Sequence, residues 1–140
     1  MNPGDVRPIR VFVADDDTRF RRVLRTLIER TPRLTLVGEA SRGEDTVDPV
    51  ALLGPDLVLM DVRMPGIGGI EAARMLLGRH PDLAVVLMSA HDVPPPSGIG
   101  ATGPGAGFVR KEDLCADVLL DLWRGRHTRS GPNWVVVPLG

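Results

Sequence analysis

The sequence predicts an α/β domain with a doubly wound sheet of five parallel strands. Short apolar runs alternate along the chain with segments whose apolar residues recur at helical spacing. This alternation calls for a parallel sheet that is covered by helices on both faces. The runs contain few polar residues, as expected of strands buried on both sides. The length of 140 residues is enough for one domain with a core of its own, and no internal repeat is visible.

The first part of the chain supplies two strands and two helices. The β-rich run Ile9–Ala14 predicts the first strand. A helix is expected over 20–28, where apolar residues recur every three or four positions. Leu34–Val37 predicts the second strand. Gly43–Leu53 predicts a weaker helix, because Pro49 lies in its interior, where proline breaks or restarts a helix.

The second part continues the same alternation. Leu57–Met60 predicts the third strand, since prolines bound this apolar run on both sides. Helical spacing then predicts a helix over Ile70–His80, and a second apolar run predicts a strand over Leu83–Met88. A short fifth strand over Phe108–Arg110 and a last helix over Asp113–Arg124 complete the predicted elements.

The stretch Pro94–Gly107 (PPPSGIGATGPGAG) interrupts this alternation. A helix is expected there, but Pro and Gly make up nine of the 14 residues. Inside a helix each Gly costs about 1 kcal/mol and each Pro about 3 kcal/mol. We therefore predict a loop or at most one irregular turn, so that the fourth helix is degenerate or missing. The apolar segment Trp134–Leu139 is expected either to cover the vacant face or the adjacent edge strand, in its own subunit or across a dimer, or to be an unstructured chain end.

The composition argues against several classes of protein. The net charge of -1 gives no overall attraction to nucleic acid or to an anionic membrane. No apolar run has the length of a membrane span, and the first eight residues lack the layout of a signal peptide. The single cysteine, Cys115, excludes an internal disulfide, suits a reducing cytosol and is expected to be buried. We expect a cytoplasmic protein without direct nucleic-acid or membrane contact.

Polar side chains stand at the ends of four predicted strands. Asp15 and Asp16 follow the first strand, Asp61 the third, Ser89 the fourth and Lys111 the fifth. Because the carboxyl ends of parallel strands lie along one edge of a sheet, these groups are expected to converge. Three clustered carboxylates repel one another unless a divalent cation joins them, and all-oxygen sites suit Mg²⁺. A hydroxyl and an ammonium beside that ion would bind phosphoryl oxygens, so the spacing predicts a Mg²⁺-dependent phosphoryl site.

The bias among the basic residues adds to this prediction. Of the 17 basic residues, 16 are Arg and one is Lys111. The position of this Lys therefore indicates a place that needs a compact, flexible ammonium in preference to a planar guanidinium.

Four segments carry a family resemblance: VFVADDD, PDLVLMDVRMPG, VVLMSA and GFVRK. In order and separation they resemble the receiver domain of bacterial two-component response regulators, which has the flavodoxin-like, CheY-like (βα)5 fold. IRVFVADDD, VGEASRGED and MDVRMPGIGGIEAAR resemble receivers that carry a LuxR-type DNA-binding domain. The resemblance covers Ile9 to Arg124. It implies a receiver domain over 1–124 and a C-terminal tail over 125–140 without an output domain.

The resemblance implies a role for each site residue. Asp61 would accept the phosphoryl group. Asp16 and Asp61 would ligate Mg²⁺ directly, together with the backbone carbonyl of Arg63, and Asp15 would act through a water molecule. Asp17 is expected to serve only as a helix N-cap.

The switch residues follow from the same comparison. Ser89 would bind a phosphoryl oxygen and reorient on activation, and Lys111 would pair with the aspartyl phosphate. Phe108 occupies the position of the family's switch aromatic, although plain core packing is an alternative for this side chain.

The function that this implies is signalling and not enzymatic. A stand-alone receiver would accept a phosphoryl group from a sensor histidine kinase or a phosphotransfer protein, and would assist only its own phosphorylation and dephosphorylation. Its conformational switch would act on a downstream protein partner or through a homodimer. One alternative is a degenerate receiver that acts as a phosphorylation-independent adaptor. Another is a haloacid-dehalogenase-type phosphatase with Asp15 as nucleophile, but its DxDx[T/V] motif fails at Arg19 and it leaves Asp61 without a role.

Overall fold

The computed structural model describes residues 7–90, 105–128 and 134–136. Within these residues the sheet has six strands in the order β2-β1-β3-β4-β5-β6, of which the first five run parallel and β6 is antiparallel to β5. The strands are β1 (Ile9–Ala14), β2 (Leu34–Ala40), β3 (Leu57–Asp61), β4 (Ala84–Ser89), β5 (Gly105–Arg110) and β6 (Trp134–Val136). The helices are α1 (Thr18–Glu29), α2 (Glu44–Leu53), α3 (Gly68–Arg79), the short 3-10 helix η2 (Lys111–Asp113) and α4 (Ala116–Arg124).

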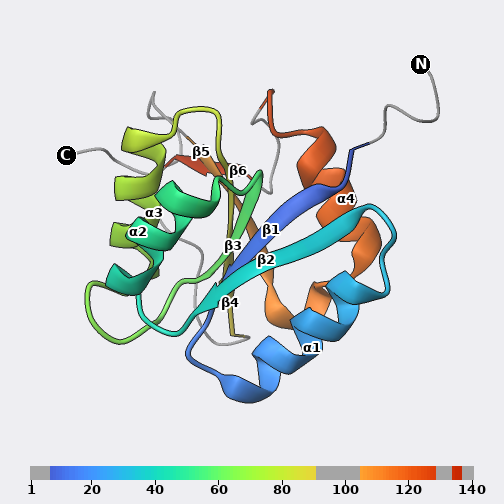
Figure 1. Ribbon diagram of the computed structural model, residues 1–140, viewed down its shortest axis with the longest axis horizontal. Helices are drawn as coiled ribbons and strands as arrows, with labels where there is room; N and C mark the ends of the chain where they lie inside the picture. Colours follow the sequence, from blue (N-terminus) through green and yellow to red (C-terminus); the bar gives the residue numbers. More distant parts are fainter. Residues whose placement is uncertain (1–6, 91–104, 129–133, 137–140) are drawn as a thin grey trace.

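The sheet lies between two helical layers, with α2 and α3 on one face and α1 and α4 on the other (Figure 1). Each layer has its own core cluster. The cluster below α2 and α3 contains Val50 and Leu76, and the cluster below α1 and α4 contains Leu24 and Leu119. β3 and β4 are buried along their whole length because both clusters pack on them. The predicted α/β fold with five parallel strands is confirmed.

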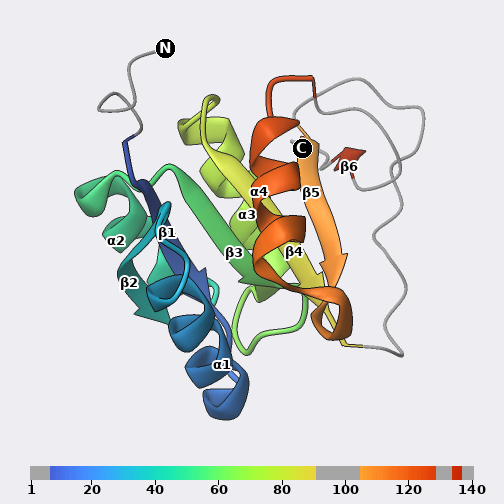
Figure 2. The ribbon, with the colours of Figure 1, turned by 90° about the vertical axis from the view of Figure 1, so that its right-hand side faces the viewer.

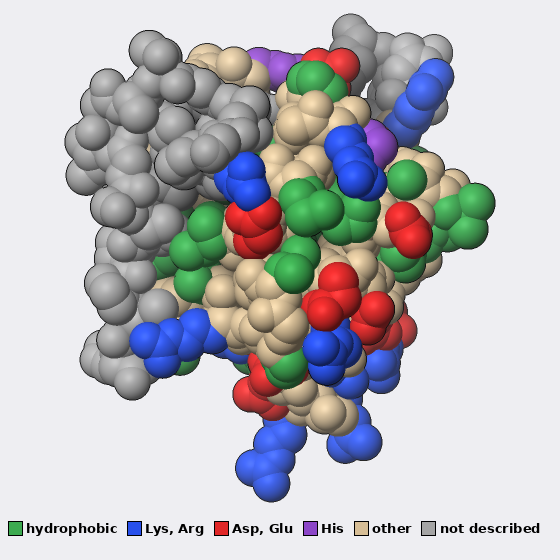
Figure 3. All heavy atoms as spheres, turned by 90° about the vertical axis from the view of Figure 1, so that its left-hand side faces the viewer, with side chains coloured by type: hydrophobic (Ala, Val, Ile, Leu, Met, Phe, Trp, Pro, Cys, Tyr) green, Lys and Arg blue, Asp and Glu red, His purple; other side chains and the backbone are tan. Residues whose placement is uncertain are grey.

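The outer surface of the α2 and α3 layer has a mixed character. Figure 3 shows acidic, basic and hydrophobic side chains interspersed on this face. Leu52 of α2 is 86% exposed, and Ile67 and Ile70 at the start of α3 are also exposed. None of the described helices is both long enough and apolar enough to cross a membrane.

Several predicted boundaries need correction. β2 continues to Ala40, three residues beyond the predicted end, because it keeps pairing with β1. Pro49 does not break α2. The carbonyl that loses its helical partner to this proline belongs to Asp45, an exposed residue of the first turn, where water can replace the missing donor.

The last helix begins later than predicted. η2 forms first, and Leu114 and Cys115 then adopt extended backbone angles before α4 starts at Ala116. Cys115 is therefore the residue that precedes the helix, and it is exposed, so the prediction of a buried cysteine is wrong.

The proline- and glycine-rich stretch is described only from Gly105 onward. Gly105–Gly107 form the first half of β5, so the predicted loop through Gly107 is wrong at these three positions. All three pair with β6, and Gly107 also pairs with β4, and this pairing overrides the weak strand propensity of glycine. The predicted loss of the fourth helix concerns 94–104, which lie outside the described residues.

The C-terminal segment adds the sixth strand. β6 pairs with the first half of β5, with Trp134 opposite Gly107 and Val136 opposite Gly105. Figure 2 shows β6 at the outer edge of the sheet beside β5. The prediction that this segment covers the adjacent edge strand within one chain is confirmed for Trp134–Val136, whereas 137–139 lie outside the described residues. The five-stranded parallel sheet of the prediction is extended by one antiparallel strand.

We expect Trp134→Ala to lower the free energy of unfolding by ~1–3 kcal/mol, because it removes a partly buried indole from the core cluster below α4. Urea denaturation followed by circular dichroism measures the change. Leu52→Ala is the control, since this side chain is 86% exposed and its removal should change stability by less than ~0.5 kcal/mol. Identical unfolding midpoints for Trp134→Ala and the parent protein would show that β6 adds no stability.

Candidate functional site

The predicted site residues converge at the carboxyl edge of the sheet, the lower edge in Figure 2. The strand register accounts for this convergence, because Ala14 lies opposite Met60 and Asp61 lies opposite Met88. The residues that follow these positions, Asp15 and Ser89, therefore stand on either side of Asp61. Ser89 in turn lies opposite Arg110, which places Lys111 just beyond the end of β5.

Lys111 lies between two buried carboxylates. Its Nζ atom is 2.7 Å from Oδ2 of Asp15 and 3.1 Å from Oδ2 of Asp61. Asp15 is completely buried and Asp61 is 6% exposed. Burial alone would lower the pKa of Lys111, but the hydrogen bond and attraction of Asp15, together with the attraction of Asp61, raise it above its ordinary value. Lys111 is therefore held as a cation at this site.

One ammonium does not neutralise two buried acids. The pKa of Asp61 is raised from 3.8 to about 7, chiefly by burial and next by repulsion from the Asp15 carboxylate, while Lys111 opposes the shift only in part. A carboxyl with such a pKa is partly protonated near neutral pH. The site therefore favours binding of additional positive charge.

The carboxylate oxygens of Asp15, Asp16 and Asp61 form a cluster that could hold a metal ion, since one oxygen from each lies within 4.8 Å of the others. Apart from its ion pair with Lys111, Oδ2 of Asp15 is buried and accepts no hydrogen bond from the described residues. A buried oxygen with spare acceptor capacity and a set of oxygen ligands both fit a divalent cation.

Backbone amides orient both buried acids in the same way. The amide of Asp17 donates to Oδ1 of Asp15 at 2.8 Å, and the amide of Arg63 donates to Oδ1 of Asp61 at 3.1 Å. Each acid thus forms a turn with the residue two positions later, as Asp commonly does. One oxygen of each acid is held by the main chain, and the other is left to face Lys111.

The loop from β3 to α3 is packed against the backbone of Asp61. A β carbon at Gly69 would overlap the carbonyl oxygen of Asp61. The amide of Gly69 donates to the carbonyl of Val62, and the amide of Val62 donates to the carbonyl of Met88. Only glycine permits this approach, which fixes the position at which Asp61 leaves the strand.

The structure brings together five of the predicted site residues, namely Asp15, Asp16, Asp61, Ser89 and Lys111. Ser89 is only 1% exposed at the end of β4. The backbone amide of Arg63 donates a hydrogen bond to the carboxylate of Asp61, and the side chain of Arg63 is exposed. The metal-ligand and phosphoryl-transfer roles of these residues stay predictions.

Two further predictions concern neighbouring residues. The side chain of Asp17 accepts hydrogen bonds from the amides of Arg19 and Phe20, so its role as N-cap of α1 is confirmed. Phe108 is buried in the core cluster below α2 and α3, which confirms core packing for this side chain. Its role as a switch stays a prediction.

Sequence reasoning missed the contribution of the first turn of α1. The ring of Phe20 lies 4.7 Å from Nζ of Lys111, so the ammonium also contacts an aromatic face. Nη1 of Arg21 donates to the carbonyl of Asp15 at 2.6 Å. The signal was available, because a helix capped by Asp17 directs residues three and four positions later back over the end of β1.

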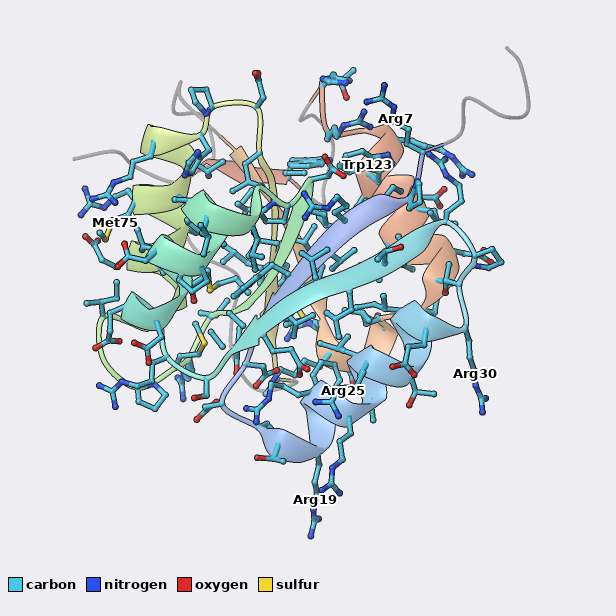
Figure 4. All side chains as sticks on the ribbon, in the orientation of Figure 1. Arg7, Arg19, Arg25, Arg30, Met75 and Trp123 are labelled. Carbon is cyan, nitrogen blue, oxygen red and sulfur yellow. The ribbon has the colours of Figure 1, made fainter. Side chains whose placement is uncertain are left out.

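Other arginines of α1 do not take part in the site. Arg25 pairs with Glu39 of β2 at 2.9 Å. Arg19 of α1, and Arg30 directly after the helix, extend away from the domain (Figure 4).

Comparisons with known proteins agree on one family. A model of the response regulator receiver domain matches residues 11–112. The response regulator GacA of Pseudomonas viridiflava is 41% identical over 104 residues, which are 74% of this chain and 48% of that protein. The chain spans about half the length of the curated relatives it matches.

Two solved structures are similar over most of the chain. The signal receiver domain of the response regulator NarL from Mycobacterium tuberculosis has a TM-score of 0.70 at 27% identity, over 86% of this chain and 99% of that chain. A two-component response regulator of the LuxR family from Aurantimonas sp. SI85-9A1 has a TM-score of 0.67 at 27% identity, over 85% of this chain and 87% of that chain.

We expect Asp61→Asn to stabilise the metal-free protein in a pH-dependent way. The pKa of Asp61 is raised to about 7 in the folded protein. The protonated carboxyl therefore contributes its full stability below pH 4, and this stability is lost as the pH rises through 7 and the carboxyl ionises. In EDTA the variant should gain ~1–3 kcal/mol at pH 8, where the parent carries both acidic charges, and much less at pH 5. Thermal unfolding at both pH values tests this difference, and a gain that does not depend on pH would contradict it.

We expect Gly69→Ala to destabilise the fold by ~1–3 kcal/mol, because the new methyl group forces α3 away from the backbone of Asp61. Gly78→Ala is the matched control. This glycine is exposed within α3, so the same chemical change should raise stability by up to ~1 kcal/mol. Denaturant midpoints that shift in the same direction for both variants would show that Gly69 has no special packing role.

Proposed function

The chain belongs to the response regulator receiver domain family, and we propose that Asp61 is its phosphoacceptor in a Mg²⁺-dependent reaction. The family is a signalling family. The observation that carries the proposal is the arrangement around Asp61, where one carboxylate oxygen is held by the amide of Arg63 and the other faces the ammonium of Lys111. An acid held in this way keeps one oxygen in a fixed place for reaction.

The transfer is a displacement at phosphorus. Oδ2 of Asp61 forms a bond to the phosphorus atom while the bond from phosphorus to the donor breaks, and the donor leaves with that bonding pair. Lys111 then moves from the carboxylate of Asp61 to a phosphoryl oxygen, which its flexible side chain can reach. The hydroxyl of Ser89 donates to another phosphoryl oxygen.

Asp16, Asp61 and the backbone carbonyl of Arg63 would hold Mg²⁺ directly, and Asp15 would hold it through water. The ion supplies charge neutralisation for the phosphoryl oxygens when it is bound. In the unmodified protein Asp15 is the stronger anchor of Lys111, since its Oδ2 contact is the shorter of the two ion pairs of this ammonium.

The chemistry of the site also defines the partners that we propose. A sensor histidine kinase or a phosphotransfer protein of the cytoplasm would supply the phosphoryl group as a phosphohistidine. Ser89 and Phe108 would report phosphorylation to a downstream protein or to a second copy of the chain. The receiver would occupy 1–124, and 125–140 would form its tail. Catalysis would be limited to the protein's own phosphorylation and dephosphorylation, and no observation favours the adaptor or the phosphatase alternative.

Phosphorylation by acetyl phosphate with Mg²⁺ tests the proposal directly. We expect the phosphoryl group on Asp61 in the parent protein, located by peptide mass after borohydride reduction of the acyl phosphate, and no modification in Asp61→Asn. Reaction at Asp15 would indicate a phosphatase of the alternative type. Reaction at neither acid, with metal binding intact, would indicate an adaptor. EDTA should abolish the reaction, because the acids then lack their cation.

A further inference from the structure

We propose that the outer edge of β5 is a docking site for the chain's own strand β6, and that release of β6 is coupled to phosphorylation of Asp61. This inference rests on the proposed function, because it assigns a means of regulation to the same site. The occupant is the described segment Trp134–Val136, which is antiparallel to the first half of β5. Backbone pairing of this kind is a common way in which proteins bind an extended segment.

Two glycines lie beside the indole of Trp134. A β carbon at Gly107 would lie 3.7 Å from Cη2 of its indole, and a β carbon at Gly125 would lie 3.5 Å from Nε1. A side chain at either of these two positions, one on β5 and one directly after α4, would therefore touch the indole. Larger residues there would occupy the space that the ring uses. The edge of β5 is thus shaped for an aromatic residue at this register.

β5 connects the surroundings of Trp134 with the phosphorylation site. Its first half, Gly105–Gly107, pairs with β6, and its second half, Gly107–Arg110, pairs with β4. Gly107 is the residue that both neighbours share. Lys111 follows directly after Arg110 and contacts Asp61. A movement of Lys111 therefore acts on one end of β5, a strand of six residues, and β6 pairs with the other end.

The packing at Gly107 leaves little freedom for movement. A β carbon at this position would be 3.1 Å from Cγ2 of Val86 and 3.3 Å from Cδ2 of Leu122. Even a methyl group would therefore be crowded at this position, so β5 fits closely between β4 and α4 here. Because Trp134 contacts the same residue, a shift of β5 also changes the surface on which the indole rests.

The direction of the coupling follows from the state in which β6 is docked. In this structure Lys111 contacts the unmodified carboxylates of Asp15 and Asp61, and β6 is paired with β5 in the position that β5 then has. Phosphorylation draws Lys111 to a new partner and favours another position of β5. A strand that binds the first position better must be released by the change, and by reciprocity a strand held in place must disfavour phosphorylation.

A disulfide lock across the two strands tests this reciprocity. Ala106 and Val135 lie directly opposite in the register, at a separation that cross-strand pairs allow a disulfide to bridge. We would combine Ala106→Cys and Val135→Cys with Cys115→Ser, which removes the exposed native thiol. Binding of beryllium fluoride, a phosphoryl mimic, to Asp61 with Mg²⁺ should be weaker in the oxidised form than in the reduced form, by about fivefold or more in Kd. Cys115→Ser alone should bind it equally with and without oxidant.

Fluorescence of Trp134 gives an independent measure of release. Trp123→Phe leaves Trp134 as the one tryptophan of the chain, because the sequence contains two. We expect acrylamide to quench Trp134 more strongly after treatment with acetyl phosphate and Mg²⁺. The same addition to the Asp61→Asn variant in this background should leave quenching unchanged.

The outcomes separate the inference from the function on which it rests. Equal affinities for beryllium fluoride in the oxidised and reduced forms, or unchanged quenching after Asp61 is shown to carry phosphate, would overturn the coupling alone. Absence of phosphate on Asp61 in every form would overturn the proposed function and the coupling together. Covalent dimers in place of an internal disulfide would overturn docking within one chain and indicate that β6 binds a second copy.

Discussion

The placement of the Lys111 ammonium between the carboxylates of Asp15 and Asp61 is the interaction on which the functional edge of this domain depends. The three groups come from the ends of β1 and β3, which pair directly, and of β5, which is separated from β3 by β4. Their ion pairs therefore join three strands of the sheet at one point. Burial first, and then repulsion from the Asp15 carboxylate, raise the pKa of Asp61 to about 7, because the single ammonium of Lys111 offsets them only in part.

The electrostatic imbalance and the rigid backbone act together. The amides of Asp17 and Arg63 hold one oxygen of each buried acid, and the close approach of Gly69 fixes the strand end at Asp61. The acids therefore cannot turn away from each other to relieve their repulsion. A cation or a change of charge at Asp61 can relieve it, which makes the site responsive to both.

The first half of β5 links the same site to β6. Gly107 and Gly125 leave space for the indole of Trp134, and the strand that carries Gly107 ends at Lys111. Pro- and Gly-rich sequence is normally a sign of weak structure. Here the same glycines at the start of β5 permit a neighbour to pack closely, so a poor strand former supports strand addition.

The sequence by itself determined the alternation of strands and helices, the acids and the lysine at the strand ends and the cap at Asp17, because these follow from periodicity and local turn chemistry. It did not determine that Phe20 lies beside Lys111, that Gly69 contacts the backbone of Asp61, or that Cys115 is exposed. These features depend on how elements distant in the chain pack together. The same holds for β6, since Trp134 gains its place only when β5 and the end of α4 have been brought together beside it.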